Sequence, residues 1–421
     1  MSTRRRLLQT AGAAAAAGLI GYRPSLGHAQ PTSPKPDKLV VITASTFGPT
    51  IETFAQQWTA QTGVPVEVIS QSYDTTYTKI VSALAGGAPT DIVMVDSIWT
   101  GTFAQAGFLS SIDAYIAPFE AELVPAAINQ RRVGGEIYSM PVTNEAKFLY
   151  YNADILERGG YSAPPESWEE ANRVAADLKE KGLVRYGHIW GWHQAEGLVC
   201  DYTLLVNGFG GVLADEEGRW LADEENCLRA LEFMVDQLRS GAADPASTSL
   251  SDREVVDSFA AGEHALLLNW SFAYGVLNNP ESSNVSGQIQ VGLIPGFEAA
   301  GTRSTTVLGG SGLAVTASSP SPDWAWDLIR YITDKPRQIE TFTIRSLVPV
   351  WSELYDSPEV VAQHPYIKQM EQQYDYASWR PNTPNYAEAS GILQIQIHQA
   401  LNGTVSAEHA LAETRSRIAS L

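Results

Sequence analysis

Residues 134–161 read GGEIYSMPVTNEAKFLYYNADILERGGY, and this stretch decides the fold. It opens on a double-glycine turn, continues as a long apolar and β-branched run broken by Pro141, and ends in a short predicted helix. The run is too long for one ordinary strand. Thr143, Asn144 and Glu145 form a polar trio at its middle. We therefore interpret this stretch as a crossing between two lobes.

The chain before this crossing predicts a parallel sheet. Three apolar runs, Leu39–Thr43, Val64–Ile69 and Asp91–Val95, read as buried strands, and helical patterns separate them. A β-α-β-α-β order with short loops gives parallel strands with right-handed crossovers. Ligands of such open sheets bind beyond the carboxyl ends of the strands. The residues that we expect at those ends as ligand contacts are Ser45, Thr46, Tyr73, Asp96 and Ser97.

Length and charge limit the class of protein. A chain of 421 residues exceeds what one core usually supports, so two domains are expected. A formal net charge of −19 argues against binding to nucleic acid or to an anionic membrane surface. The expected partner is therefore small or neutral, and a monomer is expected.

The N-terminus predicts export. Residues 3–9, TRRRLLQ, resemble the twin-arginine signal, and a short Ala/Gly-rich apolar stretch and a small-residue cleavage site follow. We assign residues 1–29 to this signal, with a soluble periplasmic protein beginning at Gln30. The two cysteines, Cys200 and Cys227, could pair in that oxidising compartment, and the sequence leaves their pairing open. Two Cys and seven scattered His make no recognisable metal or cofactor site.

The stretch after the double glycine carries a resemblance to a known family. Its pattern G-x-I-Y-x-x-P…E-A…L-x-Y-N is similar to the hinge of the periplasmic sugar-binding proteins of ABC importers, extracellular solute-binding protein family 1. Residues 88–109 resemble its trehalose/maltose branch. The resemblance implies that Glu145 faces the cleft and that Asp96 receives sugar hydroxyls. Asp96 also suits the N-cap of the next helix, and one residue can do both.

Five further segments resemble the same branch and imply ligand contacts. Trp190 and Trp192 lie in a Gly-punctuated loop, where their rings either face a sugar or pack against the lobe, and Glu196 is expected to serve a helix start. Trp270 corresponds to a sugar-stacking Trp, although Ser271 replaces the usual Pro and should leave the loop less fixed.

The remaining segments follow the family's order. Gly309 and Gly310 match glycines whose backbone approaches the ligand, although a flexible turn explains them equally well. Ser311 stands where many relatives carry Trp. Arg345 is expected near the cleft mouth, and Arg380 matches an Arg that points at the sugar.

The resemblance implies a type II periplasmic binding protein fold, an α/β architecture with mixed sheets flanked by helices and two discontinuous lobes joined by a hinge. Lobe 1 is predicted to hold residues 38–141 and 306–348, and lobe 2 residues 142–305 and 349–421. The expected function is capture of a mono- or disaccharide or related glycoside in the cleft. Closure of the lobes then signals to the permease subunits of an ABC importer and their ATPase.

Two alternatives stay open. Thr143, Glu145 and Lys147 share one face of an extended strand. With Arg345 and Arg380, Lys147 could compensate an anionic sugar such as a uronate, a sulfonated sugar or a sugar phosphate, or it could neutralise Glu145 within the hinge.

The second alternative is an enzyme. Asp96 and Glu145 could form the carboxylate pair of a periplasmic glycosidase. The chain contains no nucleophile elbow, phosphate loop or His-Glu-x-x-His motif, which disfavours enzymes of those classes. We therefore expect a binding protein and no enzyme.

Overall fold

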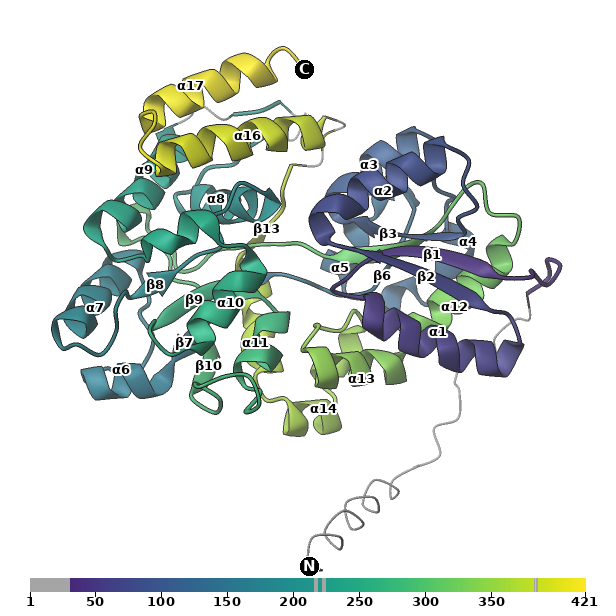
Figure 1. Ribbon diagram of the computed structural model, residues 1–421, viewed down its shortest axis with the longest axis horizontal. Helices are drawn as coiled ribbons and strands as arrows, with labels where there is room; N and C mark the ends of the chain where they lie inside the picture. Colours follow the sequence, from purple (N-terminus) through teal and green to yellow (C-terminus); the bar gives the residue numbers. More distant parts are fainter. Residues whose placement is uncertain (1–30, 216–218, 222–224, 382, 384) are drawn as a thin grey trace, which may run out of the picture.

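The computed structural model describes residues 31–421 except 216–218, 222–224, 382 and 384. The predicted signal, residues 1–29, lies outside the described residues. Two lobes lie side by side, each a sheet with helices packed around it, and extended segments run between them (Figure 1). The predicted two-lobe α/β fold is confirmed.

Lobe 1 is built on a five-stranded sheet with the order β2-β1-β3-β12-β6. Strands β1 and β2 and strands β1 and β3 pair in parallel, as predicted from the sequence. β12 runs antiparallel to both β3 and β6, which makes the sheet mixed. The strands are β1 (Leu39–Ala44), β2 (Val66–Gln71), β3 (Ile92–Asp96), β6 (Met140–Pro141) and β12 (Ser311–Val315).

Helices cover this sheet because their apolar faces need burial. Every residue of β1, β3 and β12 is buried, which explains their continuous apolar runs. The main covering helices are α1 (Gly48–Thr62), α2 (Tyr73–Ala85), α3 (Ser97–Gln105) and α12 (Pro322–Thr333).

Lobe 2 is built on a four-stranded sheet with the order β10-β7-β9-β8. β7 (Lys147–Asn152) is antiparallel to both β10 (Ile289–Gly292) and β9 (Leu266–Trp270), while β8 (His188–Ile189) is parallel to β9. The larger helices around it are α7 (Trp168–Glu180), α8 (Glu196–Gly208), α9 (Glu225–Ser240), α10 (Asp252–Ala260), α16 (Tyr386–Leu401) and α17 (Ala407–Ile418).

Short elements complete the fold. Next to the lobe boundary, the two-residue strands β11 (Thr306–Val307) and β13 (Ala377–Ser378) pair in parallel. The other short elements are β4 (Arg132–Val133), β5 (Glu136–Ile137), α4 (Asp113–Ile116), α5 (Pro125–Asn129), α6 (Ala153–Gly159), α11 (Phe272–Leu277), α13 (Lys335–Arg345), α14 (Pro358–Gln363) and α15 (Ile367–Gln373).

Three segments between the lobes are hydrogen-bonded to one another. Residues 142–146 connect β6 to β7, residues 308–310 connect β11 to β12, and residues 346–350 follow α13. The amide of Asn144 donates to the carbonyl of Val348 at 3.0 Å, and the amide of Gly309 donates to the carbonyl of Glu145 at 2.9 Å. The stretch read as a crossing therefore leaves the first sheet and enters the second. Val307 packs in the lobe 2 core, so we propose the predicted lobe boundaries with the second crossing placed at residues 308–310.

Three simpler observations complete the description. Cys200 and Cys227 are both buried and free of a disulfide. In the part of the chain that the structure describes, no helix combines the length and the apolar character needed to cross a bilayer. The same residues contain no cluster of three or more His, Cys, Asp or Glu that could hold a metal ion.

Candidate functional site

Charged side chains from both lobes meet at the edge of the cleft. Arg380, which follows β13 on the lobe 2 side, donates through Nη2 to Oδ1 of Asp96 at 3.0 Å and through Nη1 to Oε1 of Glu196 at 2.9 Å. Asp96 ends β3 of lobe 1, whereas Glu196 begins α8 of lobe 2. We call Asp96, Glu196 and Arg380 the inter-lobe cluster. It joins two of the residues predicted as ligand contacts.

Asp96 accepts several hydrogen bonds in addition. Its carboxylate accepts from the hydroxyl of Tyr73 at 2.9 Å and from the hydroxyl of Ser97 at 3.1 Å. It also accepts from the amide of Ile98 at 3.2 Å and so caps α3. Burial, and then the Asp96 carboxylate, raise the pKa of Tyr73 well above its usual range. The sequence analysis allowed Asp96 to cap a helix, and it does, while also holding Arg380.

Glu196 has a larger role than the sequence indicated. It was expected to serve the start of a helix, and it is the first residue of α8. However, its carboxylate also accepts hydrogen bonds from Arg380 and from the hydroxyls of Tyr386 and Ser390 on α16. Glu196 therefore fastens α16 and the segment before it to the lobe 2 side of the cleft.

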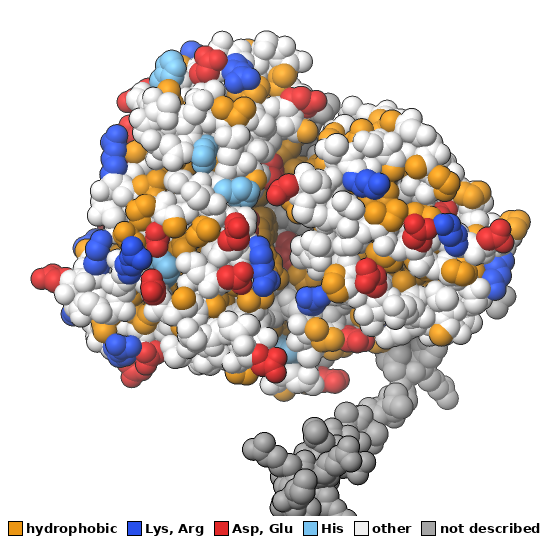
Figure 2. All heavy atoms as spheres, in the orientation of Figure 1, with side chains coloured by type: hydrophobic (Ala, Val, Ile, Leu, Met, Phe, Trp, Pro, Cys, Tyr) orange, Lys and Arg blue, Asp and Glu red, His pale blue; other side chains and the backbone are white. Residues whose placement is uncertain are grey.

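A pocket opens next to this cluster, between α2 and α3 of lobe 1 and α8 and α16 of lobe 2. Its volume is about 360 Å³, within the range of small-molecule sites. Figure 2 shows a furrow between the two lobes. The residues that line the pocket are Tyr73, Asp74, Tyr77, Ile98, Trp99, His193, Gln194, Ala195, Glu196, Tyr386, Ala387, Ser390 and Gln394.

The two walls of this pocket differ in chemistry. The lobe 1 wall is aromatic, because Trp99 stacks on Tyr73 with ring centroids 5.5 Å apart and meets Tyr77 edge to face. The lobe 2 wall offers carboxylate, hydroxyl, amide and imidazole groups, among them those of Glu196 and Gln394. Aromatic faces cover the C–H surfaces of sugars, while polar groups pair with their hydroxyls. This pocket is our candidate site.

A larger hollow of about 1050 Å³ lies elsewhere, between α7 and α9 on lobe 2. None of the predicted contacts lines it. The smaller pocket is the better candidate because it lies between the lobes and beside the inter-lobe cluster.

Glu145 lies in the hinge as predicted, but protein groups bind its carboxylate. The hydroxyls of Thr143 and Ser271 donate to it at 2.7 and 2.6 Å, and the amide of Ser271 donates at 3.1 Å. Burial raises the pKa of Glu145, although these hydrogen bonds oppose the shift. Ser271 was expected to leave its loop less fixed than a Pro would. The serine supplies two donors that Pro lacks, and both tie its loop to Glu145.

Lys147 does not pair with Glu145, so that hypothesis is wrong. Its Nζ donates to Asp201 at 2.6 Å and to Asp252 at 3.0 Å, and the side chain is 0% exposed. We call these three residues the lobe 2 cluster. Burial acts to lower the pKa of Lys147, but the two carboxylates outweigh it and the pKa is raised. Held in this way, Lys147 has no free charge for an anionic ligand.

Trp190 and Trp192 pack inside lobe 2, which corrects the expectation that they face a sugar. Their rings stack at 4.7 Å, and Trp190 also packs on Trp168 at 5.1 Å. Both are almost fully buried. Trp192 donates through Nε1 to Asp201 at 3.1 Å, so it belongs to the surroundings of the lobe 2 cluster.

Trp270 is half-buried at the end of β9. Its Nε1 donates to Asp252 at 2.8 Å, and Lys147 lies 5.4 Å from its ring centroid. A Cβ at Gly309 would lie 2.7 Å from the indole, so only glycine fits there. The glycine is therefore explained by the indole of Trp270, and the approach of its backbone to a ligand stays a prediction.

Gly310 and Ser311 lie at the start of β12. Gly310 has a φ of +126°, which favours glycine, and its carbonyl accepts from the amide of Ser97 at 3.2 Å. Ser311 is buried in the sheet opposite Asp96.

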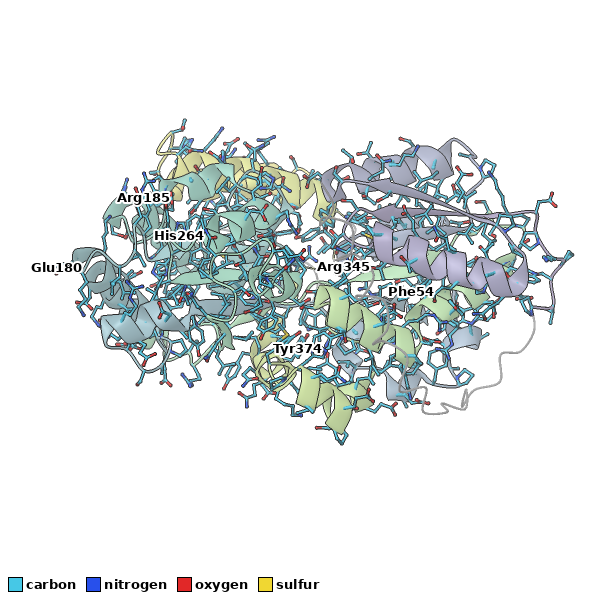
Figure 3. All side chains as sticks on the ribbon, turned by 60° about the horizontal axis from the view of Figure 1, so that its bottom comes forward. Phe54, Glu180, Arg185, His264, Arg345 and Tyr374 are labelled. Atoms are coloured by element: carbon cyan, nitrogen blue, oxygen red, sulfur yellow. The ribbon has the colours of Figure 1, made fainter. Side chains whose placement is uncertain are left out.

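Tyr73 is the predicted ligand contact that lines the pocket, and the other predicted contacts are not among its described lining residues. Ser45 and Thr46 are exposed after β1, and neither lines it. Arg345 is exposed at the end of α13 and does not line the pocket either. Figure 3 shows Arg345 near the boundary between the lobes.

Sequence reasoning missed several pocket residues. Trp99 and Tyr77 carried a signal, since one follows the third strand and the other lies on the second helix. His193, Gln194, Tyr386, Ser390 and Gln394 carried none, because only the docking of α16 beside α8 brings them to the cleft. Arg131 was also missed. It is 0% exposed, and burial lowers its pKa to about 10.

Comparisons with known proteins agree with this geometry. A family model described as bacterial extracellular solute-binding protein matches residues 44–339. The chain is similar to a probable ABC transporter-binding protein of Deinococcus radiodurans, with 28% identity over 87% of this chain and 88% of the relative. It is also similar to the maltose-bound MalE3 protein of T. maritima, with 26% identity, a TM-score of 0.85, and 91% and 99% of the two chains covered.

A second solved structure shows the same fold. The ABC transporter solute-binding protein of Agrobacterium radiobacter K84, in complex with ribitol, has a TM-score of 0.81 and 22% identity, and the match covers 91% of this chain and 99% of that one.

Proposed function

Because the chain belongs to the bacterial extracellular solute-binding proteins, the substrate-binding components of ABC transporters, we propose that it captures a neutral mono- or disaccharide or a related glycoside in the inter-lobe pocket. Exported by a twin-arginine signal, it delivers this ligand in the periplasm to the permease subunits of an importer. Members of this family bind and deliver solutes, so no catalytic role is proposed.

The pocket's two unlike walls carry the proposal. One ring system from lobe 1 and a row of hydrogen-bonding groups from lobe 2 face one space, so a ligand that binds both walls favours the closed arrangement of the lobes. The maltose bound to the T. maritima relative, at 26% identity, supports a saccharide as the ligand. Micromolar affinity needs only about −8 kcal/mol, which a few hydrogen bonds and a stacked ring can supply.

The charges around the cleft favour a neutral ligand over an anionic one. Lys147 is paired with two carboxylates, and Arg380 is paired with two more. An anion would therefore have to compete with carboxylates that already hold these cations. The anionic-sugar alternative depended on Lys147, and this lysine is already paired with Asp201 and Asp252.

A thermal-shift screen of the protein from Gln30 onward tests the proposal. The panel holds neutral disaccharides, monosaccharides, polyols, uronates, sulfonated sugars and sugar phosphates. A ligand at 100 times its dissociation constant should stabilise the fold by about 2.7 kcal/mol, a shift of a few degrees for this length. We expect shifts with neutral sugars. A shift only with the acids would contradict the neutral class, and none at all would contradict the sugar class.

A further inference from the structure

A buried arginine beside the cleft has donors that no described residue uses. Arg131 follows α5 and is 0% exposed. Its Nη1 donates to the carbonyl of Val95 at 3.3 Å. Its Nε and Nη2 have no hydrogen-bond partner among the residues that the structure describes. A buried cation without a carboxylate partner is costly, so such a group calls for a functional explanation.

The two unpaired nitrogens belong together. Nε and Nη2 form one edge of the planar guanidinium and present two roughly parallel N–H groups. This is the edge that binds two acceptor oxygens at once. We call it the Arg131 fork. Both nitrogens of this bidentate edge lack a hydrogen-bond partner among the described residues, so the two unpaired donors are adjacent and point the same way.

The fork lies where lobe 1 meets the crossing segments. A Cβ at Gly310 would be 3.2 Å from Nη2 of Arg131 and 3.1 Å from the carbonyl oxygen of Thr143. Asp96 and Arg380 are the charged groups that act on Arg131. The fork therefore lies beside the crossing segments, next to Gly310 and near the inter-lobe cluster, and in this arrangement of the lobes it does not line the pocket.

Asp96 does not use the fork. Its carboxylate is already bound by Arg380, Tyr73, Ser97 and the amide of Ile98. The Arg380 bridge holds the two lobes together beside the fork, so a ligand can reach it when that bridge opens and the lobes part.

Building on the proposed function, we infer that Arg131 is a ligand-binding residue whose fork receives two neighbouring oxygens of a neutral sugar, such as vicinal hydroxyls. The local charges select the neutral class. Two guanidinium groups, of Arg131 and Arg380, lie near three carboxyl groups. Those of Asp96 and Glu196 both pair with Arg380, and the third is that of Glu145. A ligand carboxylate would leave this region with an excess of negative charge.

The test is a pair of titrations with Arg131→Met. The wild type and the variant are each titrated by calorimetry with a neutral sugar found in the screen, with its monodeoxy analogues and with the corresponding sugar acid. We expect the variant to bind the neutral sugar at least tenfold more weakly. We also expect the loss caused by one deoxy position to disappear in the variant, because the hydroxyl and the fork are coupled.

Stability separates ligand binding from a structural role. Replacing an unpaired buried cation by an apolar chain of similar length should leave the melting temperature unchanged or raise it. A structural arginine would give a lower melting temperature and an unchanged affinity, which would overturn the inference. Arg131→Lys keeps the charge without the fork and should also weaken binding. If both variants fail to fold, the fold itself needs the fork and the inference is overturned.

The outcomes also separate this inference from the proposed function. A wild type that binds no neutral sugar contradicts both. A wild type that binds one, together with a variant of equal affinity, contradicts the inference alone. Binding of only the sugar acid, with dependence on Arg131, would overturn the neutral class.

Discussion

Two clusters in this molecule share one charge pattern, a cation held by two carboxylates, and differ in their surroundings. The inter-lobe cluster joins Arg380 to Asp96 and Glu196, and the lobe 2 cluster joins Lys147 to Asp201 and Asp252. In each, one cation is shared by two carboxylates. The first bridges two lobes that can separate, whereas the second lies inside one lobe. Residue type alone therefore does not separate a binding group from a structural one.

The surroundings explain the difference. Two indoles donate hydrogen bonds to the lobe 2 cluster, that of Trp192 to Asp201 and that of Trp270 to Asp252. The inter-lobe cluster instead lies beside the pocket, which Glu196 lines. We expect loss of Lys147 to reduce stability and loss of Arg380 to reduce affinity.

The largest effect is expected from Lys147→Met. The variant leaves the buried carboxylate of Asp201 and the partly buried one of Asp252 without their shared cation, so the free energy of unfolding should fall by about 3–5 kcal/mol. Urea unfolding measures it. Lys368→Met is the matched control, because Lys368 also pairs with two carboxylates but is partly exposed, and it should cost about 0–1 kcal/mol. Equal losses in the two variants would remove the distinction.

Arg380→Met should weaken sugar binding about a hundredfold, equivalent to about 2.7 kcal/mol. The closed form would lose the bridge that Arg380 makes between Asp96 of lobe 1 and Glu196 of lobe 2. Calorimetry measures the affinity. Arg345→Met is the control, since Arg345 is exposed and away from the pocket, and it should bind normally. If Arg345→Met alone weakened binding, the site would be misplaced.

Trp270→Ala should weaken binding at least tenfold while the protein still folds. The indole is half-buried, donates to Asp252 and lies against Gly309 in a segment between the lobes, so we propose that it stacks on a ligand bound there. Trp324→Ala is the control, since Trp324 is also half-buried but packs against Trp58 in lobe 1. Unchanged affinity in Trp270→Ala would remove this residue from the site.

A pH dependence of stability is expected as well. Burial raises the pKa of Asp201 to about 7, although Lys147 opposes the shift. An unfolded Asp has a pKa of about 3.9. The folded state therefore holds a proton that the unfolded state has lost between these values, so stability rises as the pH falls from about 7 to about 4. Relative to Asp201→Asn, the wild type should gain stability in this window. Parallel profiles would contradict the raised pKa.

Local patterns predicted the framework well. The apolar runs of β1 and β3 predicted buried parallel strands, because such strands need continuous apolar sequence, and both are fully buried. β2 was predicted from Val64–Ile69 and also pairs in parallel, although it is only partly buried. The polar trio within a long extended run identified the crossing. Asp96 and Arg380 were predicted as ligand contacts from separate motifs and are in fact hydrogen-bonded to each other.

Side-chain partners distant in sequence were beyond local patterns. Alternation along residues 143–147 put Glu145 and Lys147 on one face, yet the partners of Lys147 come from positions 54 and 105 residues away. Glu196 reads as a helix start, and its contact with Tyr386 spans 190 residues. Such pairs depend on how helices dock, which neither periodicity nor composition encodes.

Calorimetric titration of the wild type and Tyr77→Ala with the neutral sugar from the screen tests the central claim most directly. Tyr77 belongs to the aromatic wall and takes part in neither ionic cluster. We predict saturable binding of one sugar per wild-type chain and at least tenfold weaker binding to the variant. Equal affinity for both proteins, or no saturable binding to the wild type, would contradict a sugar site in the inter-lobe pocket.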